Sequence, residues 1–276
     1  MTKFSTLVIE PYVVVARHAR NHITPNRMHE DGLPQKLGFR GALVLGAAIF
    51  GHMTRGIVSR FGQDWLNQSV TDAKFLKSVC DGDRLRIETI PIQGVRAFNV
   101  TAYNETMNGE LCATLVTEFS GNPPPIDPMA DLDPNEWEGK VTKERSWERI
   151  EIGRAYRTLS HILSQAENDQ WINVLQDESQ IYKKKPYSAF HPSQILLQAP
   201  LGACNQYRGD NAIHASSKVV IRDMLKVGDE VQLLTVPAAK WEKKGNQWVT
   251  LYCAVRRNGY ICAELFHTQI FKLRGA

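Results

Sequence analysis

The sequence lacks the features of a secreted, membrane-spanning or disulfide-bonded protein. Its longest apolar run, residues 42–50, is interrupted by Gly46 and is far shorter than the roughly 20 residues of a membrane-spanning helix. The N-terminus has no charged segment leading into an apolar run, as a secretory signal would have. The five cysteines are an odd number and form no Cys-x-x-Cys pair. We therefore expect a cytoplasmic protein with reduced thiols and no membrane partner.

Charge and motifs exclude further classes. The net charge is only +4 and the basic residues are scattered, so no nucleic-acid partner is expected. No glycine-rich phosphate loop and no nucleophile elbow is present. His18 and His22, with His29 and Glu30 after them, could suggest a metal site, but His18 directly follows a β-branched strand, where a helical face of ligands is not expected. We expect neither a metal nor a bound cofactor.

The second half of the chain repeats the pattern of the first. A Gly-Asp turn, a proline and an Asn-Gly dipeptide return in the same order: Gly82-Asp83, Pro91 and Asn108-Gly109, then Gly228-Asp229, Pro237 and Asn258-Gly259. The offset is 146 for the first two (228 − 82 and 237 − 91) and 150 for the third (258 − 108). Such growth is expected when insertions lie in hairpin loops. The repeat predicts two copies of one small α+β unit.

Each copy is expected to contain a strand, a central helix and an antiparallel meander. The first unit (1–120) has an expected strand at 9–16, a buried helix at 41–60, and strands at 69–75, 83–92, 98–103 and 110–119. A proline-rich linker spans 121–140. The second unit (141–276) has an expected strand at 147–156, a polar helical segment to 176, an apolar helix at 193–207, and strands at 214–221, 229–236, 247–255 and 260–272. The helix and the four following strands can both be buried only if the sheet wraps around the helix.

The segment before the first central helix resembles a known signature. The residues that carry the resemblance are Asn26, His29, Asp31, Gly38-Phe39 and Gly46. Together they are similar to the hydratase signature of the MaoC-like, hotdog-fold family, in which an acidic residue, an Asn, a Pro and a His precede a Gly-Phe turn and a glycine-containing helix. The resemblance implies a double hotdog: two fused units, each with a long central helix wrapped by an antiparallel sheet.

The resemblance also implies a reaction. MaoC-like enzymes hydrate a trans-2-enoyl thioester, or dehydrate a 3-hydroxyacyl thioester, carried by CoA or by an acyl carrier protein. The expected partners are therefore a small acyl thioester and, where the acyl group is not carried by CoA, an acyl carrier protein. Assembly of the chain into a homo-oligomer is also possible. Two positions depart from the pattern. The family's catalytic acid lies five residues before the histidine, where this chain has Thr24, and its proline lies two residues before the histidine, where this chain has Arg27.

The chemistry itself assigns roles to these residues. Adding water to an unsaturated thioester needs a base, an acid, and donors for the enolate oxygen. His29 suits the proton transfers because imidazole titrates near neutrality. Asn26 could hold the water or fix the imidazole tautomer. Unpaired N–H groups at the helix start, around Gly46, could donate hydrogen bonds to the thioester oxygen.

The remaining candidate residues extend this site. Leu45 and Thr24 are further expected substrate contacts, and Asp31 is the third expected catalytic residue. If Thr24 cannot act as the base, the alternatives are Asp31, Glu30 or His22.

Other interpretations of the same residues stay open. His29 could be a hydrogen-bonded surface residue, Asn26 a turn residue, and His214 could reach the site of the other unit. One site per chain is predicted, because 177–187 contains no Asn-x-x-His, and the second unit would supply the walls of an acyl tunnel. The alternative functions are thioester hydrolysis and a non-catalytic acyl-binding module, since fold alone does not fix function.

Overall fold

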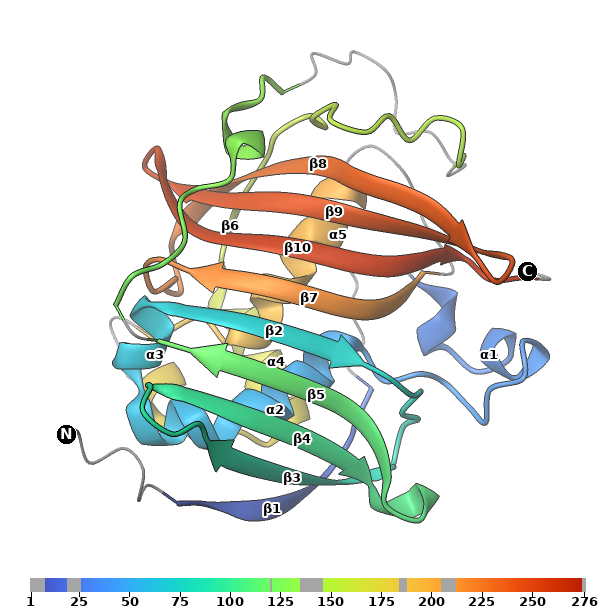
Figure 1. The fold of residues 1–276 in the computed structure, drawn as a ribbon. Coiled ribbons are helices and arrows are strands. Elements are labelled where there is room, and N and C mark those ends of the chain that lie inside the picture. Colours follow the sequence, from blue (N-terminus) through green and yellow to red (C-terminus); the bar gives the residue numbers. More distant parts are fainter. Residues whose placement is uncertain are drawn as a thin grey trace.

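The computed structural model describes residues 8–18, 26–119, 121–134, 146–183, 188–204 and 212–274, whose ten strands form one antiparallel sheet with helices on one side (Figure 1). The first half contains β1 (Ile9–Val15), η2 (Arg27–His29, a 3-10 helix, as are all η elements), α1 (Leu33–Lys36), α2 (Gly46–Phe61), α3 (Gln63–Asn67), β2 (Ser69–Phe75), β3 (Arg84–Pro91), β4 (Ala97–Asn104), η3 (Glu105–Met107) and β5 (Glu110–Glu118). The second half contains η4 (Pro128–Asp131), β6 (Leu159–Ile162), α4 (Gln165–Leu175), η5 (Gln180–Tyr182), η6 (Pro192–Leu197), α5 (Gln198–Cys204), β7 (Ile213–Ile221), β8 (Glu230–Lys243), β9 (Asn246–Arg257) and β10 (Tyr260–Lys272).

The strand order shows the repeat directly. It runs β1-β3-β4-β5-β2-β7-β10-β9-β8-β6, so each half has the same internal order and the two halves join through β2 and β7. Asp72 pairs with Lys218 across this junction, and their separation in sequence (218 − 72 = 146) is the offset of the repeat. A residue that pairs with its own equivalent lies on a two-fold axis. The predicted duplication is confirmed, and its two copies are arranged like the subunits of a dimer.

The hairpin turns are also duplicated. Asn108 and Gly109 both have positive φ (56° and 73°) and close the loop 105–109, which begins with η3. Asn258 and Gly259 also have positive φ (51° and 81°), and they alone separate the paired residues Arg257 and Tyr260, as in a type I′ turn. The predicted hairpin between β4 and β5 is confirmed, and the equivalent turn joins β9 to β10.

The first central helix, α2, begins later than its sequence predicts. The apolar composition favoured a start near Gly41, but the chain is extended up to Leu45. Leu43 forms a β-bridge with Cys80, and the backbone N–H of Val44 donates to the carbonyl of Val79 at 2.8 Å. These contacts hold residues 43 and 44 out of the helix, so tertiary pairing overrides helix propensity. The helix is buried from Gly46 to Thr54, as predicted.

The second unit departs from prediction in two places. Its apolar helix is not continuous from 193: it is 3-10 in η6 and α-helical only in α5, and Pro200 within α5 has no N–H to donate. Residues 205–211 lie outside the described chain. The predicted strand at 147–156 is a series of turns, in which Gly153 has a φ of 78°. The first strand of this unit is instead β6, which pairs with β8.

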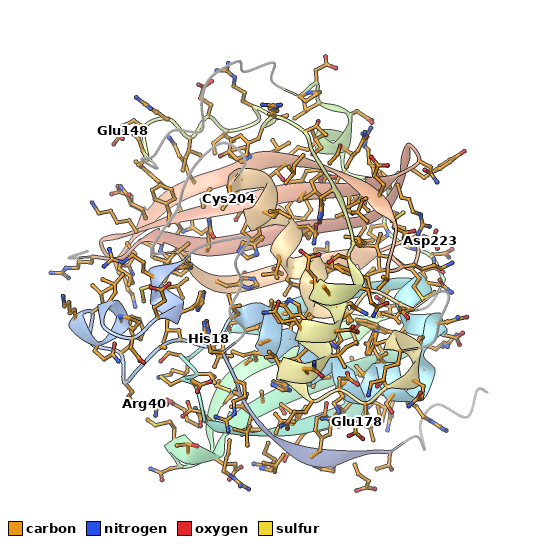
Figure 2. The ribbon with its side chains drawn as sticks, turned by 180° about the vertical axis from the view of Figure 1, so that it is seen from behind. His18, Arg40, Glu148, Glu178, Cys204 and Asp223 are labelled. Carbon is orange, nitrogen blue, oxygen red and sulfur yellow. The ribbon has the colours of Figure 1, made fainter. Side chains whose placement is uncertain are left out.

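The helices cover the inner face of the sheet, as Figure 2 shows from behind. At Gly51 in α2, a Cβ atom would lie 2.1 Å from Ser193 Oγ in η6, so only glycine permits this approach of the two central segments. None of the described helices has the length and apolarity required to cross a bilayer.

A buried histidine at this helix contact makes stability depend on pH. His52 in α2 is 2% exposed, and neither ring nitrogen has a hydrogen-bond partner among the described residues. Burial lowers its pKa from 6.5 to about 4; nearby Arg55 and His191 add to the decrease, and Asp177 opposes it. The unfolded chain binds a proton here below pH 6.5, but the folded chain does so only near pH 4. The free energy of unfolding therefore falls as pH drops through this interval.

Substituting His52 with methionine should remove this dependence. Between pH 7 and pH 4.5, the wild-type chain should lose about 2 kcal/mol more stability than H52M, since each pKa unit is worth about 1.4 kcal/mol. Urea denaturation of both chains at the two pH values measures the difference. Equal losses would show that His52 is not the group responsible.

The start of the linker packs on the outer face of the second unit. Glu264 in β10 is 2% exposed, and its Oε1 accepts from the Asp127 backbone N–H (2.8 Å) and from the Tyr252 hydroxyl (2.9 Å). Its Oε2 accepts from Arg222 Nε at 2.7 Å. Burial beside Glu264 raises the pKa of Tyr252, which stays protonated and donates. One carboxylate thus joins β9, β10, the linker and Arg222, the residue that follows β7.

Replacing Glu264 with glutamine should destabilise the chain by about 3 kcal/mol, because it leaves the guanidinium of Arg222 partly buried without a counter-charge. The exposed pair Glu151 and Arg154 provides a matched control: Glu151→Gln should change stability by less than about 1 kcal/mol. Thermal unfolding of the two variants measures the contrast, and similar melting temperatures would contradict it.

Candidate functional site

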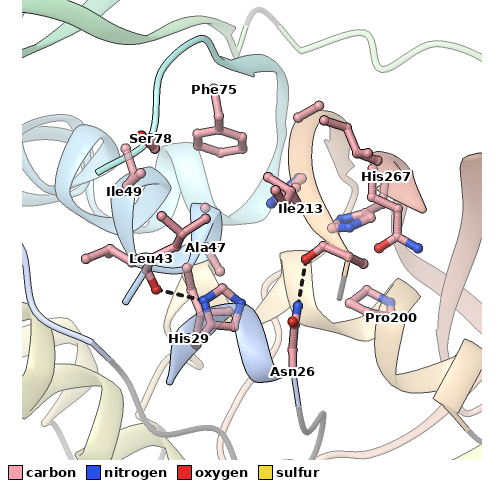
Figure 3. A pocket seen from close by; sticks show the side chains of 18 of the residues that line it. Asn26, His29, Leu43, Ala47, Ile49, Phe75, Ser78, Pro200, Ile213 and His267 are labelled. Carbon is pink, nitrogen blue, oxygen red and sulfur yellow. Dashed lines mark hydrogen bonds between the residues drawn. The ribbon is translucent and has the colours of Figure 1, made fainter. Parts of the chain in front are cut away.

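A cavity of about 320 Å³ lies at the start of α2, between the two units (Figure 3). Its lining is mainly apolar and includes residues of both halves of the chain. The polar and charged residues among those lining it are Asn26, His29, Lys77, Ser78, Cys204, His214, Trp248, His267 and Gln269. The volume is in the range of small-molecule sites, which are typically concave and apolar with a few polar groups.

His29 lines this cavity, and a hydrogen bond determines which of its ring nitrogens carries the hydrogen. Its Nδ1 is 2.7 Å from the carbonyl oxygen of Leu43, as Figure 3 shows. A carbonyl can only accept, so Nδ1 carries the hydrogen and Nε2 keeps its lone pair. Burial lowers the pKa of His29 to about 4, opposed by the bond to Leu43 and aided by nearby His18. The imidazole is therefore neutral at physiological pH and able to accept a proton.

Asn26 fixes the loop that carries His29. Its Oδ1 caps η2 by accepting from the Met28 backbone N–H at 3.0 Å, and its Nδ2 donates to the Ala212 carbonyl at 2.7 Å. Both polar atoms of the amide are thus engaged, and one of them reaches the second unit. Asn26 also lines the cavity, and each of its polar atoms keeps one further hydrogen-bonding position, a lone pair on Oδ1 and a hydrogen on Nδ2.

The start of α2 supplies polar groups to the same cavity. Leu45 is the N-cap and makes no side-chain cap hydrogen bond, while Leu45, Gly46 and Ala47 all line the cavity. The first N–H groups of an α-helix have no acceptor within the helix. A Cβ on Gly46 would lie 2.5 Å from His214 Nδ1, so glycine lets this ring of the second unit pack closely against the helix start.

Sequence reasoning missed part of the site. His267 and Gln269 in β10 line the cavity and are 4% and 3% exposed, and Gln269 Nε2 has no partner among the described residues. The signal was present in the alternation of this strand: Leu265 and Phe271 face the core at the same period, so 267 and 269 are core-facing positions occupied by polar residues. His214, left open from sequence, is also in the lining.

The other predicted residues are not all brought to the cavity. Asp31 is exposed, accepts from Gln35 Nε2 at 3.3 Å, and is not in the lining, because α1 follows it and holds it at the surface. Glu30 is likewise exposed. Thr24 and His22 lie outside the described residues.

His18 and His29 lie next to each other but do not form a metal site with other described residues. The His18 ring stacks on His29 with centroids 5.8 Å apart. No three His, Cys, Asp or Glu side chains among the described residues are placed to bind one metal ion.

The described lining contains no carboxylate. Its one charged side chain is Lys77, whose Nζ is 2.9 Å from Glu110. The described lining contains three imidazoles, those of His29, His214 and His267. For His214, burial lowers the pKa well below 6.5, and the adjacent His267 adds to the decrease.

Comparisons with known proteins show the fold. No protein-family model matches the sequence, and no curated protein matches it. A solved structure of a MaoC-like dehydratase is 14% identical, with a TM-score of 0.60 over 98% of this chain and 100% of that chain. A conserved protein from Mycobacterium tuberculosis, described as a double hotdog, is 9% identical, with a TM-score of 0.63 over 96% of each chain. A proposed thioesterase from Novosphingobium aromaticivorans is 10% identical, with a TM-score of 0.51 over 95% of this chain and 96% of that chain.

The chain therefore has the double hotdog fold that its sequence resemblance implied. Structures with this fold are described both as dehydratases and as thioesterases. At these identities the likeness extends to the fold alone, and the chemistry has to be argued from the cavity.

Proposed function

We propose that the chain is a hydro-lyase that reversibly adds water to a trans-2-enoyl thioester and removes it from a 3-hydroxyacyl thioester. One observation carries the proposal: the neutral imidazole of His29, whose Nε2 has no hydrogen bond among the described residues, shares an apolar cavity with the start of α2, which has no side-chain cap. Hydration needs this pair, a base for the water and donors for the oxygen that gains charge as the enolate forms.

Each wall of the cavity has a role in this reaction. The thioester oxygen would accept hydrogen bonds from the backbone N–H groups of Gly46 and Ala47, where the helix dipole also favours negative charge. His29 would take a proton from water and return it to the α-carbon. The apolar residues of the second unit, among them Leu197, Pro200 and Ile270, would contact the acyl chain.

The carrier of the acyl group is part of the proposal. The substrate would be a CoA ester or the same acyl group on an acyl carrier protein, and neither the reaction nor the site needs a further cofactor. The chain already contains both units of the fold, so a homo-oligomer is not required to complete the cavity.

A mass-spectrometric assay tests the reaction class. Purified protein is incubated with a series of trans-2-enoyl-CoA and 3-hydroxyacyl-CoA esters of increasing chain length, and the expected result is the gain or loss of one water by at least one ester. Release of free CoA thiol would favour thioester hydrolysis instead. Ester binding with no conversion of any ester would favour a non-catalytic acyl-binding module.

A further inference from the structure

The second unit places another histidine in a fixed orientation at the same cavity. His214, near the start of β7, stacks on His267 with centroids 3.9 Å apart and 25° between the rings. On another side, the ring of Phe75 from the first unit lies 4.5 Å away. These two rings hold the imidazole plane, so its nitrogens have defined directions.

The hydrogen bonds of His214 define its tautomer. Nε2 is 2.8 Å from Ser217 Oγ and 3.2 Å from the Ser216 carbonyl oxygen. The carbonyl can only accept, so Nε2 carries the hydrogen and Nδ1 keeps its lone pair. Nδ1 has no hydrogen bond among the described residues, and it lies beside Gly46 at the helix start, where a Cβ would be 2.5 Å from it.

His29 and His214, one from each unit, thus line the same cavity, and each has a ring nitrogen, Nε2 and Nδ1 respectively, without a hydrogen bond among the described residues; the described lining has no carboxylate. We propose, as an extension that rests on the proposed hydration activity, that His214 is a second catalytic residue, which accepts a hydrogen bond from the reacting water while His29 takes the other hydrogen of that water. A water molecule has two hydrogens to donate, and the two lone pairs would fix its direction of attack.

The reaction balances with these two groups. The water oxygen forms a bond to the β-carbon as one of its hydrogens moves to His29 Nε2, and the π electrons shift to give an enolate. The second hydrogen stays on the oxygen, hydrogen-bonded to His214 Nδ1, and becomes the hydroxyl hydrogen of the product. The proton on His29 then moves to the α-carbon, which restores both the thioester carbonyl and the neutral imidazole.

Two substitutions at position 214 separate catalysis from packing. Glutamine places its amide at the distance of Nε2 and can keep the contact with Ser217, but it removes the acceptor at Nδ1. Asparagine places its amide oxygen at the distance of Nδ1 and loses the contact with Ser217. For the most active enoyl-CoA ester, His214→Gln should lower kcat about a hundredfold with little change in KM, whereas His214→Asn should stay within about tenfold of the wild-type kcat.

The outcomes distinguish the two proposals. If the wild-type chain hydrates no ester, the proposed function fails and this inference fails with it. If the wild-type chain is active and His214→Gln retains full kcat, or loses no more than His214→Asn, the second catalytic residue is overturned while the hydratase assignment stands.

A third variant tests the proposal if the substitutions at position 214 prevent folding, which circular dichroism would detect. Ser217→Ala removes the anchor of the ring without changing the imidazole, and a serine-to-alanine change on a buried strand is small in volume. It should lower kcat about tenfold and leave KM unchanged, since the ring loses the shorter of its two hydrogen bonds and is held less firmly. Full kcat in Ser217→Ala would overturn the role of His214.

Discussion

Replacing His29 with asparagine should lower the kcat for hydration of an enoyl-CoA ester by about a thousandfold, because general acid–base catalysis typically contributes factors of this size. The asparagine amide nitrogen takes the position of Nδ1, so it can still donate to the carbonyl of Leu43. What it lacks is the lone pair of Nε2. The variant should therefore fold normally and lose the base, and the loss of conjugated-enoyl absorbance measures its rate.

Asp31→Ala provides the control for this prediction. Asp31 is exposed and contacts Gln35 rather than the cavity, so its removal should leave the hydration rate unchanged. If His29→Asn retained the wild-type rate, the proposed reaction would have no base and would have to be abandoned. If Asp31→Ala abolished the rate instead, the acid that the sequence predicted would be required after all.

Local sequence patterns predicted the fold well because the duplication repeats them. The Gly-Asp turns, the Asn-Gly hairpins and the period-2 strands are short-range signals, and each occurs twice at a nearly constant offset. The segments whose structure was predicted wrongly depend on contacts with residues distant in sequence. Residues 41–45 have an apolar composition that suits a helix, yet the pairing of Leu43 and Val44 with Cys80 and Val79 keeps them out of it.

The site was only half visible in the sequence for the same reason. The motif around His29 and Gly46 is contiguous, so it could be recognised. His214 and His267 are far from it along the chain and reach the cavity only because β2 pairs with β7, which brings the second unit against the start of α2. Asp31 matched the motif by position, but a turn of backbone decides which way a side chain points.

Substituting Gly46 with alanine should lower kcat by between about a hundredfold and a thousandfold, the cost of disturbing donors to a developing oxyanion. The new Cβ would lie 2.5 Å from His214 Nδ1 and 3.1 Å from Phe75 Cε2, so a side chain or the helix start has to move. The ring of His214 is held by Ser217 and His267 and cannot turn away freely. Alanine is a better helix former than glycine, so helix propensity does not predict a loss of folding.

Gly41→Ala is the matched control for Gly46→Ala. It lies in the same segment, has no positive φ, and a Cβ there would meet nothing within 4 Å, so its kcat should equal that of the wild type. The double variant Gly46→Ala/His214→Ala tests the cause of the loss. If the clash with His214 is the main effect, the double variant should be no slower than His214→Ala alone, because the two losses share one origin. Fully additive losses would instead show that Gly46 acts through the helix N–H groups independently of His214.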